Sequence, residues 1–313
     1  FGVSLEQLIS SNTLANPNLL EVGQVLIIPA PEPGQIGPDF KVIPDAELVY
    51  GPGNALFDIP AFVQSQGGYL ASYSEDVSER RMSGVEIVQQ VASDFSVNPR
   101  LLLAVLEYQS GWVTKSSPDT STKDYPIGVY DTWRRGLYRQ LAFVADNLNL
   151  GYYAWRVNAA ASWTLFDGSV VPVHATINAG TAGVQQLFAR LYGREDWQRA
   201  VTQDGLFATY QNMFGYPFDF AVEPLVPPGL QQPHMQLPFE SGREWAFTGG
   251  PHGGWGDGSA WAALDFAPPG DQLGCVLSDD WVVAITDGLV VRSGGGAVLQ
   301  DLDGDGYEQT GWV

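Results

Sequence analysis

Apolar residues recur at helical spacing through the middle of the chain, behind recognisable helix-start signals. Residues 83–86 read Ser-Gly-Val-Glu, a capping box that predicts an amphipathic helix as far as Phe95. Residues 98–99, Asn-Pro, predict the first turn of a strongly apolar helix that runs through Leu106 or beyond. Three more helices are predicted, over residues 136–157, 181–192 and 195–213, with a break near residue 150 left open in the first. The middle of the chain, residues 53–222, is therefore predicted to be an all-α domain.

Towards the end of the chain the pattern changes to short β-branched and aromatic runs. These runs predict strands over residues 262–267, 281–285, 289–292 and 297–302. Residues 287–288, Asp-Gly, predict a hairpin turn between two of them. Residues 301–305 carry aspartate at alternate positions, but an EF-hand would place glutamate where Trp312 stands. A polar hairpin loop is therefore favoured over a calcium site.

The N-terminal residues predict a helix behind Ser4 and a short strand over residues 24–29. Proline- and glycine-rich stretches predict two linkers, although residues 40–53 could hold an extended segment that packs on the residues after it. The predicted fold is a multidomain α+β chain in five segments: 1–30 a small module, 31–52 a linker, 53–222 the helical domain, 223–238 a Pro-rich linker, and 239–313 an antiparallel β domain.

Composition and charge narrow the range of partners. The chain of 313 residues carries a formal net charge of -20, which argues against a nucleic-acid partner because no basic patch can neutralise phosphates. No apolar run of about 18 residues is present, so no membrane insertion is expected. Cys275 is the only cysteine, and we expect a small buried residue or half of a disulfide whose partner lies beyond Val313. The sequence does not indicate an oligomeric state.

The candidate chemistry lies in one glycine-rich stretch. His252 stands in the loop Gly-Gly-Pro-His-Gly-Gly, and Asp265 lies inside the apolar run 262–267. Imidazole nitrogen and carboxylate oxygen are zinc ligands, and a catalytic zinc takes three protein ligands and a water. The glycines would let the loop fold over, so that His252 meets Asp265 on a buried strand. We therefore predict that His252 and Asp265 are two ligands of a Zn²⁺ ion.

The same stretch resembles a known family. "GGPH…ALDFAPPGD", followed by "WVVAITDGLVVRSG", looks like the start of the LytM/lysostaphin family of zinc peptidoglycan endopeptidases. The long gap between His252 and Asp265 resembles the β-lytic branch. The resemblance implies that both residues are zinc ligands. It also implies a later Tyr-x-His and His-x-His that supply the third ligand and the catalytic histidines. No histidine follows His252 in this sequence, so those residues are expected beyond Val313.

Residues 1–30 resemble the second half of a LysM module, which grips glycans that contain N-acetylglucosamine. The resemblance is carried by Asn12, by Asn-Pro-Asn at residues 16–18 and by the Gly-Gln-x-Leu-x-Ile-Pro tail at 23–29. The opening strand and first helix of the module have no counterpart. We therefore expect a partial LysM unit that frays or leans on a neighbour.

The helical domain resembles a degenerate lysozyme or lytic transglycosylase. "SVNPRLLLAVLEYQSGW" and "HATINAGTAGV" look like two signatures of that family, in the expected order. Gln109 stands where the family has its catalytic glutamate, and an amide cannot protonate a glycosidic oxygen. Glu107, two residues earlier, would point elsewhere on the helix. The domain is thus either a spacer or a glycan-holding groove formed by Gln109, Trp112 and Asn178.

Together the resemblances imply a secreted peptidoglycan hydrolase with zinc as its cofactor and peptidoglycan as its partner, located outside the cell or in its envelope. The expected reaction is zinc-dependent endopeptidase cleavage of stem peptides or cross-bridges. A non-catalytic peptidoglycan-binding or scaffold protein is the alternative, and a lytic transglycosylase or another glycan-cleaving enzyme is less favoured. Residues 1–313 by themselves are expected to be inactive, because the catalytic histidines would lie beyond Val313.

Overall fold

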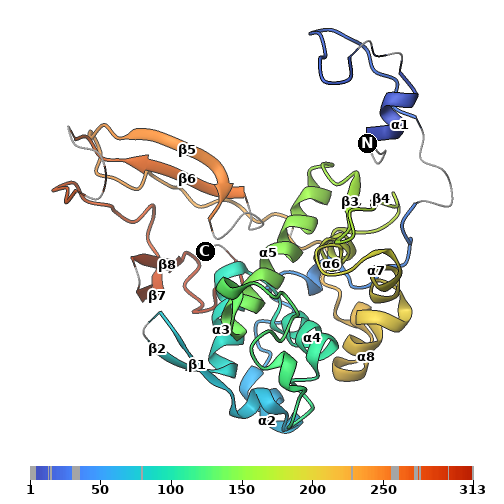
Figure 1. The fold of residues 1–313 in the computed structure, drawn as a ribbon. Coiled ribbons are helices and arrows are strands. Elements are labelled where there is room, and N and C mark those ends of the chain that lie inside the picture. The colour runs from blue at the N-terminus through green and yellow to red at the C-terminus, as the bar shows by residue number, and fades with distance from the viewer. Residues whose placement is uncertain are drawn as a thin grey trace.

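The computed structural model describes residues 5–12, 14, 16–29, 36–78, 80–226, 228–254, 261–270, 274, 276–294 and 296–311. These residues form a mixed α/β structure with eight α-helices and four two-stranded antiparallel sheets (Figure 1). The helices are α1 (Leu5–Ser10), α2 (Ile59–Gln66), α3 (Gly84–Phe95), α4 (Pro99–Ser110), α5 (Leu137–Arg156), α6 (Ala179–Ala189), α7 (Arg194–Ala200) and α8 (Ala208–Phe214). The strands are β1 (Ser74–Val77), β2 (Arg80–Ser83), β3 (Ser162–Thr164), β4 (Val170–Pro172), β5 (Ala246–Gly253), β6 (Trp261–Ala267), β7 (Leu289–Gly294) and β8 (Ala297–Asp301).

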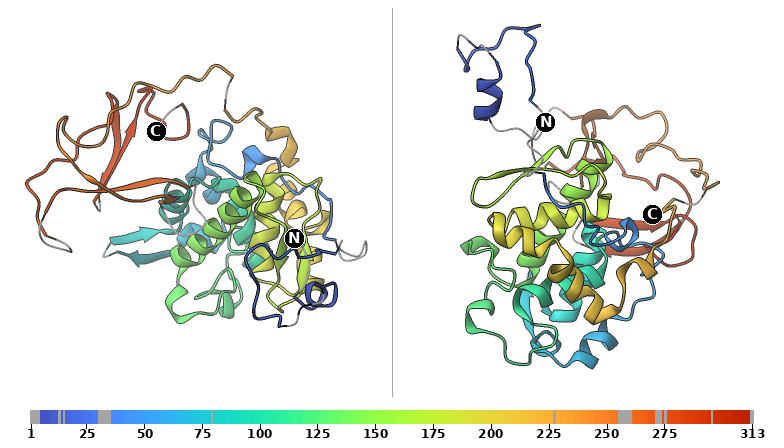
Figure 2. Two further views of the ribbon diagram at one scale, coloured as in Figure 1. Left: turned by 90° about the horizontal axis from the view of Figure 1, so that it is seen from above. Right: turned by 90° about the vertical axis from the view of Figure 1, so that its right-hand side faces the viewer.

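The hydrophobic core lies in the helical body, between a short N-terminal segment and the C-terminal hairpins (Figures 1 and 2). Residues 101–106 of α4 are fully buried. Helix α5 packs against both α3 and α6. A Cβ added at Gly183 of α6 would lie 2.6 Å from the carbonyl oxygen of Leu148 on α5. The two helices therefore approach closely because glycine has no side chain at this point.

Two predicted helix starts are confirmed at the level of hydrogen bonds. The Ser83 hydroxyl accepts from the backbone N–H of Glu86 at 3.3 Å, and the Glu86 carboxylate accepts from the backbone N–H of Ser83 at 2.8 Å. The Asn98 side chain accepts from the backbone N–H of Arg100 at 2.9 Å, one residue after Pro99. Helices α3 and α4 begin at these caps as the sequence predicts.

The helical body begins earlier than the predicted boundary at residue 53. Val42, Ile43 and Leu48 are fully buried in its core, although residues 31–52 were predicted to be a linker. The Leu48 carbonyl accepts from the backbone N–H of Asn98 at 2.9 Å. Residues 40–50 therefore pack on the helices as predicted, but they are not extended throughout, because residues 45–47 form a 3-10 helix. The part that the structure describes from residue 36 onward is not a free linker.

The body also differs from an all-α domain. The hairpins β1–β2 and β3–β4 lie within it, and helix α2, which was not predicted, is capped by Asp58 and ends at Gly67 (φ 65°). Helix α5 is continuous through residue 150. The predicted helix over 195–213 is instead divided into α7, a π-helical turn and α8. Two residues lie outside helical conformation at the division: Thr202, with φ -114° and ψ -174°, and Gly205, with φ -94° and ψ -130°.

The N-terminal segment contains α1, while Ser4, the predicted cap, lies outside the described residues. Residues 24–29 do not form the predicted strand. Instead, the Asn12 side chain pairs with the backbone of Ile27, donating to its carbonyl at 2.7 Å and accepting from its N–H at 2.7 Å. No residue of α1 is buried. A strand needs a second backbone strand to pair with. Here the Asn12 side chain, rather than another strand, takes the backbone hydrogen bonds of Ile27, so no strand forms.

The C-terminal part consists of two hairpins, β5–β6 and β7–β8. The strand predicted at 262–267 is confirmed by β6, but the prediction that it is buried is wrong, because residues 262–267 are exposed or half-buried. Residues 281–285 form no strand; they contact residues 236–239 through the Phe239–Val282 bridge and two backbone hydrogen bonds. The 289–292 run therefore pairs with β8 rather than across the predicted 287–288 turn. Cys275 and Trp312 lie outside the described residues. No helix in the part of the chain that the structure describes is long and apolar enough to cross a bilayer.

Candidate functional site

His252 and Asp265 meet on the β5–β6 hairpin. The imidazole Nε2 of His252 lies 2.7 Å from Oδ2 of Asp265. In the strand register Asp265 faces Gly249, while His252 faces Ala263. The two side chains are therefore diagonal neighbours on paired strands. Both are about half exposed, at 47% and 50%. The predicted pair is brought together at a position that solvent and a ligand can reach.

Glycines in β5 create the space for this contact. A Cβ on Gly249 would lie 2.9 Å from Oδ2 of Asp265, and one on Gly250 would lie 2.6 Å from the Ala263 carbonyl oxygen. Gly250 also has a φ of +115°, which favours glycine. The sequence placed His252 in a loop, but it lies in a strand whose register shifts on both sides of it. These irregularities turn a glycine-rich stretch into a strand that presents its histidine to Asp265.

The His252 ring is held at both nitrogens. Nδ1 lies 2.8 Å from the carbonyl oxygen of Gly253, and Nε2 faces Asp265. The Gly253 carbonyl, followed by the Asp265 carboxylate, raises the pKa of His252 above its ordinary value. A hydrogen bond from Nδ1–H to a backbone carbonyl is the usual way in which a protein fixes an imidazole so that Nε2 can bind a metal.

The donor atoms of this pair suit zinc, although a further ligand is needed. Two ligands on a tetrahedral zinc, at bond lengths of about 2.0–2.1 Å, lie about 3.3 Å apart. The His252–Asp265 contact would therefore open by only about 0.6 Å on binding. Among the described residues, the only group of three or more metal-binding side chains within 4.8 Å is Asp301, Asp303 and Asp305. The described chain thus places no third ligand beside the pair.

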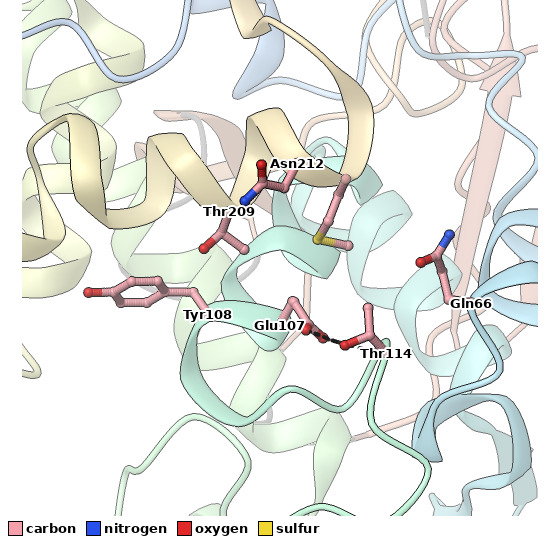
Figure 3. A pocket seen from close by; sticks show the side chains of 7 residues that line it. Gln66, Glu107, Tyr108, Thr114, Thr209 and Asn212 are labelled. Carbon is pink, nitrogen blue, oxygen red and sulfur yellow. Dashed lines mark hydrogen bonds between the residues drawn. The ribbon is translucent and has the colours of Figure 1, made fainter.

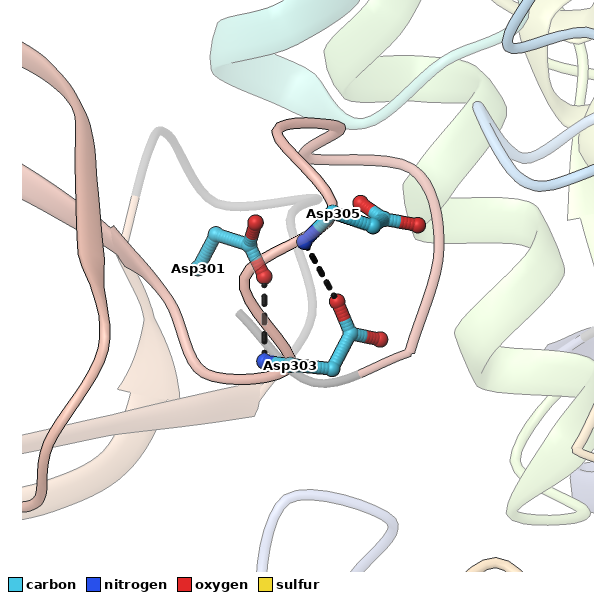
Figure 4. A group of neighbouring side chains, drawn as sticks. All are labelled: Asp301, Asp303 and Asp305. Carbon is cyan, nitrogen blue, oxygen red and sulfur yellow. Dashed lines mark hydrogen bonds between the residues drawn. The ribbon is translucent and has the colours of Figure 1, made fainter.

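The aspartate group instead organises the turn after β8 (Figure 4). Asp301 is buried and accepts hydrogen bonds from the backbone N–H groups of Asp303 at 3.1 Å, Gly304 at 3.0 Å and Gly306 at 2.7 Å. The bond from Gly306 is the largest of the effects that lower the pKa of Asp301. Asp303 in turn accepts from the N–H of Asp305 at 3.3 Å. These bonds account for the carboxylates as elements of the predicted polar loop.

Two of the three residues predicted to hold a glycan are structural. The Trp112 side chain is fully buried, with its ring against Tyr69 and Tyr73, so it cannot stack on a sugar. The Asn178 amide donates to the Ile43 carbonyl at 2.8 Å and to Asp45 at 2.7 Å. Asn178 therefore ties the start of α6 to the segment before α2. The structure does not bring these two residues and Gln109 together in one groove.

Gln109 lines a cavity of about 260 Å³ at the C-terminal end of α4. Its Oε1 accepts a hydrogen bond from the Tyr192 hydroxyl at 2.8 Å. The sequence did not single out the tyrosines that surround it, Tyr125, Tyr130 and Tyr192. Tyr125 and Tyr130 lie in a short segment with proline and glycine over residues 125–130, which is their only signal in the sequence, and nothing in the sequence marked Tyr192.

Glu107 is not placed to act as a glycosidase acid (Figure 3). Its carboxylate accepts from the backbone N–H groups of Val113 at 3.0 Å and Thr114 at 3.1 Å, and from the Thr114 hydroxyl at 2.6 Å. It lines a cavity of about 330 Å³ with Tyr108, Gln66, Thr209, Asn212 and Met213, and none of these offers a second carboxylate. Glycoside hydrolysis uses two carboxyl groups, one of them protonated. Glu107 therefore serves as the cap that closes the turn after α4.

Two family models match parts of this chain, and only the LysM resemblance of the N-terminal residues is among the families that the sequence pointed to. Residues 41–227 match the family model described as "LasA, N-terminal domain", and residues 1–29 match the model described as "LysM domain". The first match begins at residue 41, within the segment that packs into the helical body. No curated protein and no solved structure matches the chain.

Proposed function

This chain belongs to the family described as LasA, N-terminal domain, and from that membership we propose that it is part of a secreted, zinc-dependent peptidoglycan endopeptidase. The two family matches together indicate a peptidoglycan-related hydrolase or binding protein. The observation that carries the endopeptidase proposal is the 2.7 Å contact between His252 Nε2 and Asp265 Oδ2. It brings one nitrogen and one oxygen donor together on the hairpin that resembles the start of the LytM/lysostaphin family.

In this proposal His252 and Asp265 hold the metal and the rest of the hairpin positions them. A bound zinc would polarise the scissile carbonyl and lower the pKa of its water to about 7. The Gly253 carbonyl, accepting from Nδ1–H of His252, fixes the ring so that Nε2 points at the shared site. The third ligand and the general base would come from the histidine motifs that the family resemblance implies. The bonds cut would be in stem peptides or cross-bridges.

The N-terminal residues fit the same polymer. LysM modules bind glycans of the peptidoglycan and chitin type, and residues 1–29 match that family. The Asn12–Ile27 pairing holds the half-module in a defined shape. We propose that this segment contributes to attachment on the glycan strands, while the C-terminal hairpins carry the metal, and that the protein acts in the cell envelope or outside the cell.

A non-catalytic peptidoglycan-binding or scaffold protein is the second candidate. It is favoured by the missing third ligand beside His252 among the described residues, since two protein ligands alone hold zinc weakly. A glycan-cleaving enzyme has less support. Glu107 is engaged as a turn cap, and Gln109 stands at the position of the family's acid.

A digestion of purified sacculi distinguishes these functions. The longest natural form of the protein is incubated with sacculi, with and without a zinc chelator, and new amino termini and new reducing ends are counted. The endopeptidase proposal expects amino termini that chelation abolishes. His252→Ala and Asp265→Ala should each remove this activity and lower the bound zinc. His174→Ala is the matched control, because His174 contacts Thr176 on the helical body instead.

Each outcome of this experiment supports one of the three functions. Undiminished release by both site variants, or release that chelator leaves unchanged, would refute the metal pair. Binding to sacculi without any new termini would establish the scaffold function instead. New reducing ends would point to glycan cleavage.

A further inference from the structure

The hairpin that carries His252 and Asp265 specifies its own strand register only weakly. In the part of the chain that the structure describes, β5 and β6 form a sheet of two strands. Such a hairpin is marginally stable alone, and glycine-rich strands are prone to slip along their partners. Strand β5 has glycine at three of its eight positions and three register shifts against β6. Because side chains alternate between the two faces of a strand, a slip by one residue would turn Asp265 away from His252.

A cluster of aromatic rings holds the opposite face of this hairpin. Phe266 directly follows Asp265 in β6, so its ring lies on the other face of the strand. It pairs with Phe247 across the strands at a centroid separation of 5.8 Å, and it lies 5.7 Å from the ring of Phe239. Phe239 stacks on Trp245, just before β5, at 5.1 Å and an interplanar angle of 5°. One ring therefore contacts both sides of the open end of the hairpin.

Phe239 itself lies outside the hairpin and is held by a third segment. It forms a backbone bridge with Val282, and the segment around Val282 makes two further backbone hydrogen bonds to residues 236–238. Arg243, between Phe239 and β5, pairs at 3.0 Å with Asp280, whose side chain is only 12% exposed. The Phe239 ring thus has a defined position against which β6 can be aligned.

We propose that Phe239 is a positioning residue for the metal pair and that its ring pins the register of β5 and β6. The contact between Phe239 and Phe266 forms only when Phe266 faces the aromatic cluster, and Asp265 then lies on the side of His252. The His252–Asp265 contact is about half exposed, so by itself it would fix this arrangement weakly. The consequence for the metal rests on the proposed function, whereas the pinning of the register does not.

Nuclear magnetic resonance of the longest natural form of the protein tests the register directly. In the wild type, cross-strand Overhauser effects are expected between Gly249 and Asp265 and between Phe247 and Phe266. Phe239→Leu keeps an apolar side chain but removes the ring, so both effects should be lost. Phe239→Tyr keeps the ring and should retain them.

Titration of the same proteins with Co²⁺ alone, followed by its visible absorption, tests the metal pair without a catalytic assay. Loss of a residue that supports metal ligands typically weakens binding by about 10–100-fold, so Phe239→Leu should raise the Co²⁺ dissociation constant about tenfold or more. Phe239→Tyr should match the wild type. Phe166→Leu is the matched control, because the same substitution there falls on a ring that is 76% exposed in the helical body. Unchanged thermal melting of the helical body verifies that the variants fold.

The two measurements must change together. Overhauser effects and Co²⁺ affinity that Phe239→Leu leaves at their wild-type values would overturn the proposal. A loss of Co²⁺ affinity with an unchanged register would also overturn it, because Phe239 would then act by another route. A wild type that binds no Co²⁺ would refute the metal proposal alone, and the Overhauser effects would then decide by themselves whether the ring pins the register.

Discussion

Replacing Glu47 by alanine should be among the most destabilising single changes in the helical body. Glu47 is fully buried, although the sequence places it in a proline-rich stretch. Its carboxylate accepts from Arg100 at 3.1 Å and from Asn98 at 2.8 Å, and it also accepts a short hydrogen bond from the Tyr210 hydroxyl. One side chain thus joins the segment before α2 to α4 and α8.

The expected loss comes from the groups that the substitution leaves behind. The Arg100 side chain is only 11% exposed, so alanine at position 47 strands a nearly buried guanidinium. Breaking a buried ion pair in this way costs about 3–5 kcal/mol, against a total stability of about 5–15 kcal/mol for a typical domain. Arg81→Ala is the matched control. The Arg81–Asp76 pair is 61% and 71% exposed, and such pairs contribute at most about 1 kcal/mol.

Urea unfolding followed by far-UV circular dichroism measures both losses. Equal slopes against denaturant for the wild type and the variants establish that the free energies can be compared. A loss for Glu47→Ala below about 1 kcal/mol, no greater than the Arg81→Ala loss, would refute the reasoning, because Arg100 would then be solvated or paired elsewhere.

A pH series on Glu47→Gln tests the same group independently. Burial raises the pKa of Glu47 above its ordinary value of 4.5, so the native state holds this proton more tightly than the unfolded chain. The contribution of Glu47 to stability is then greatest below pH 4.5 and falls as pH rises through the folded pKa. The free energy of unfolding of the wild type, relative to Glu47→Gln, should therefore decrease over that interval. An increase would contradict the burial argument.

Three further predictions rest on contacts in the helical body and at its border with the hairpins. The Ser169 hydroxyl and backbone N–H, together with the Arg194 backbone N–H, lower the pKa of Asp167 to about 2. The contribution of Asp167 to stability should therefore be present above pH 3.8 and be lost as the pH falls towards 2. Asp167→Asn should remove this part of the acid-unfolding curve. Gly183→Ala should cost about 1–3 kcal/mol by overpacking the α5–α6 contact, whereas Gly270→Ala, with open space around it, should cost little in the same thermal melts. Arg292→Ala should speed amide exchange in β7 and leave α4 unchanged, because Arg292 links β7 to α3 through Asp94 at 2.7 Å.

Local signals in the sequence predicted local structure well. The capping box at residues 83–86 and the Asn-Pro at 98–99 fix their own helix starts through bonds that span three residues or fewer. The linker assignment failed because the partners of Glu47 lie 51, 53 and 163 positions away. Proline and glycine content indicates how flexible a backbone segment is. It does not show which distant residues will pack over that segment and bury it.

The candidate site was predictable in chemistry and less so in geometry. The glycine-rich loop, the strand that carries Asp265 and the family resemblance together predicted that His252 and Asp265 would meet. The strand irregularities that bring them to 2.7 Å depend on cross-strand register, which the sequence does not display. Trp112 was predicted to lie on a glycan-binding surface. It follows directly after α4, and its side chain instead packs into the hydrophobic core. Gln109 kept a place on a cavity, in the company of tyrosines that no motif had marked.

The contact between His252 and Asp265 depends on Gly249, a residue that has no donor atom of its own. A methyl group there would stand 2.9 Å from the Asp265 oxygen that faces the histidine, closer than such a contact allows. A larger residue at this position would therefore force the Asp265 carboxylate to shift away from His252. A comparison of related chains that scored only the histidine and the aspartate would count such a chain as retaining the contact, so this glycine should be scored together with them.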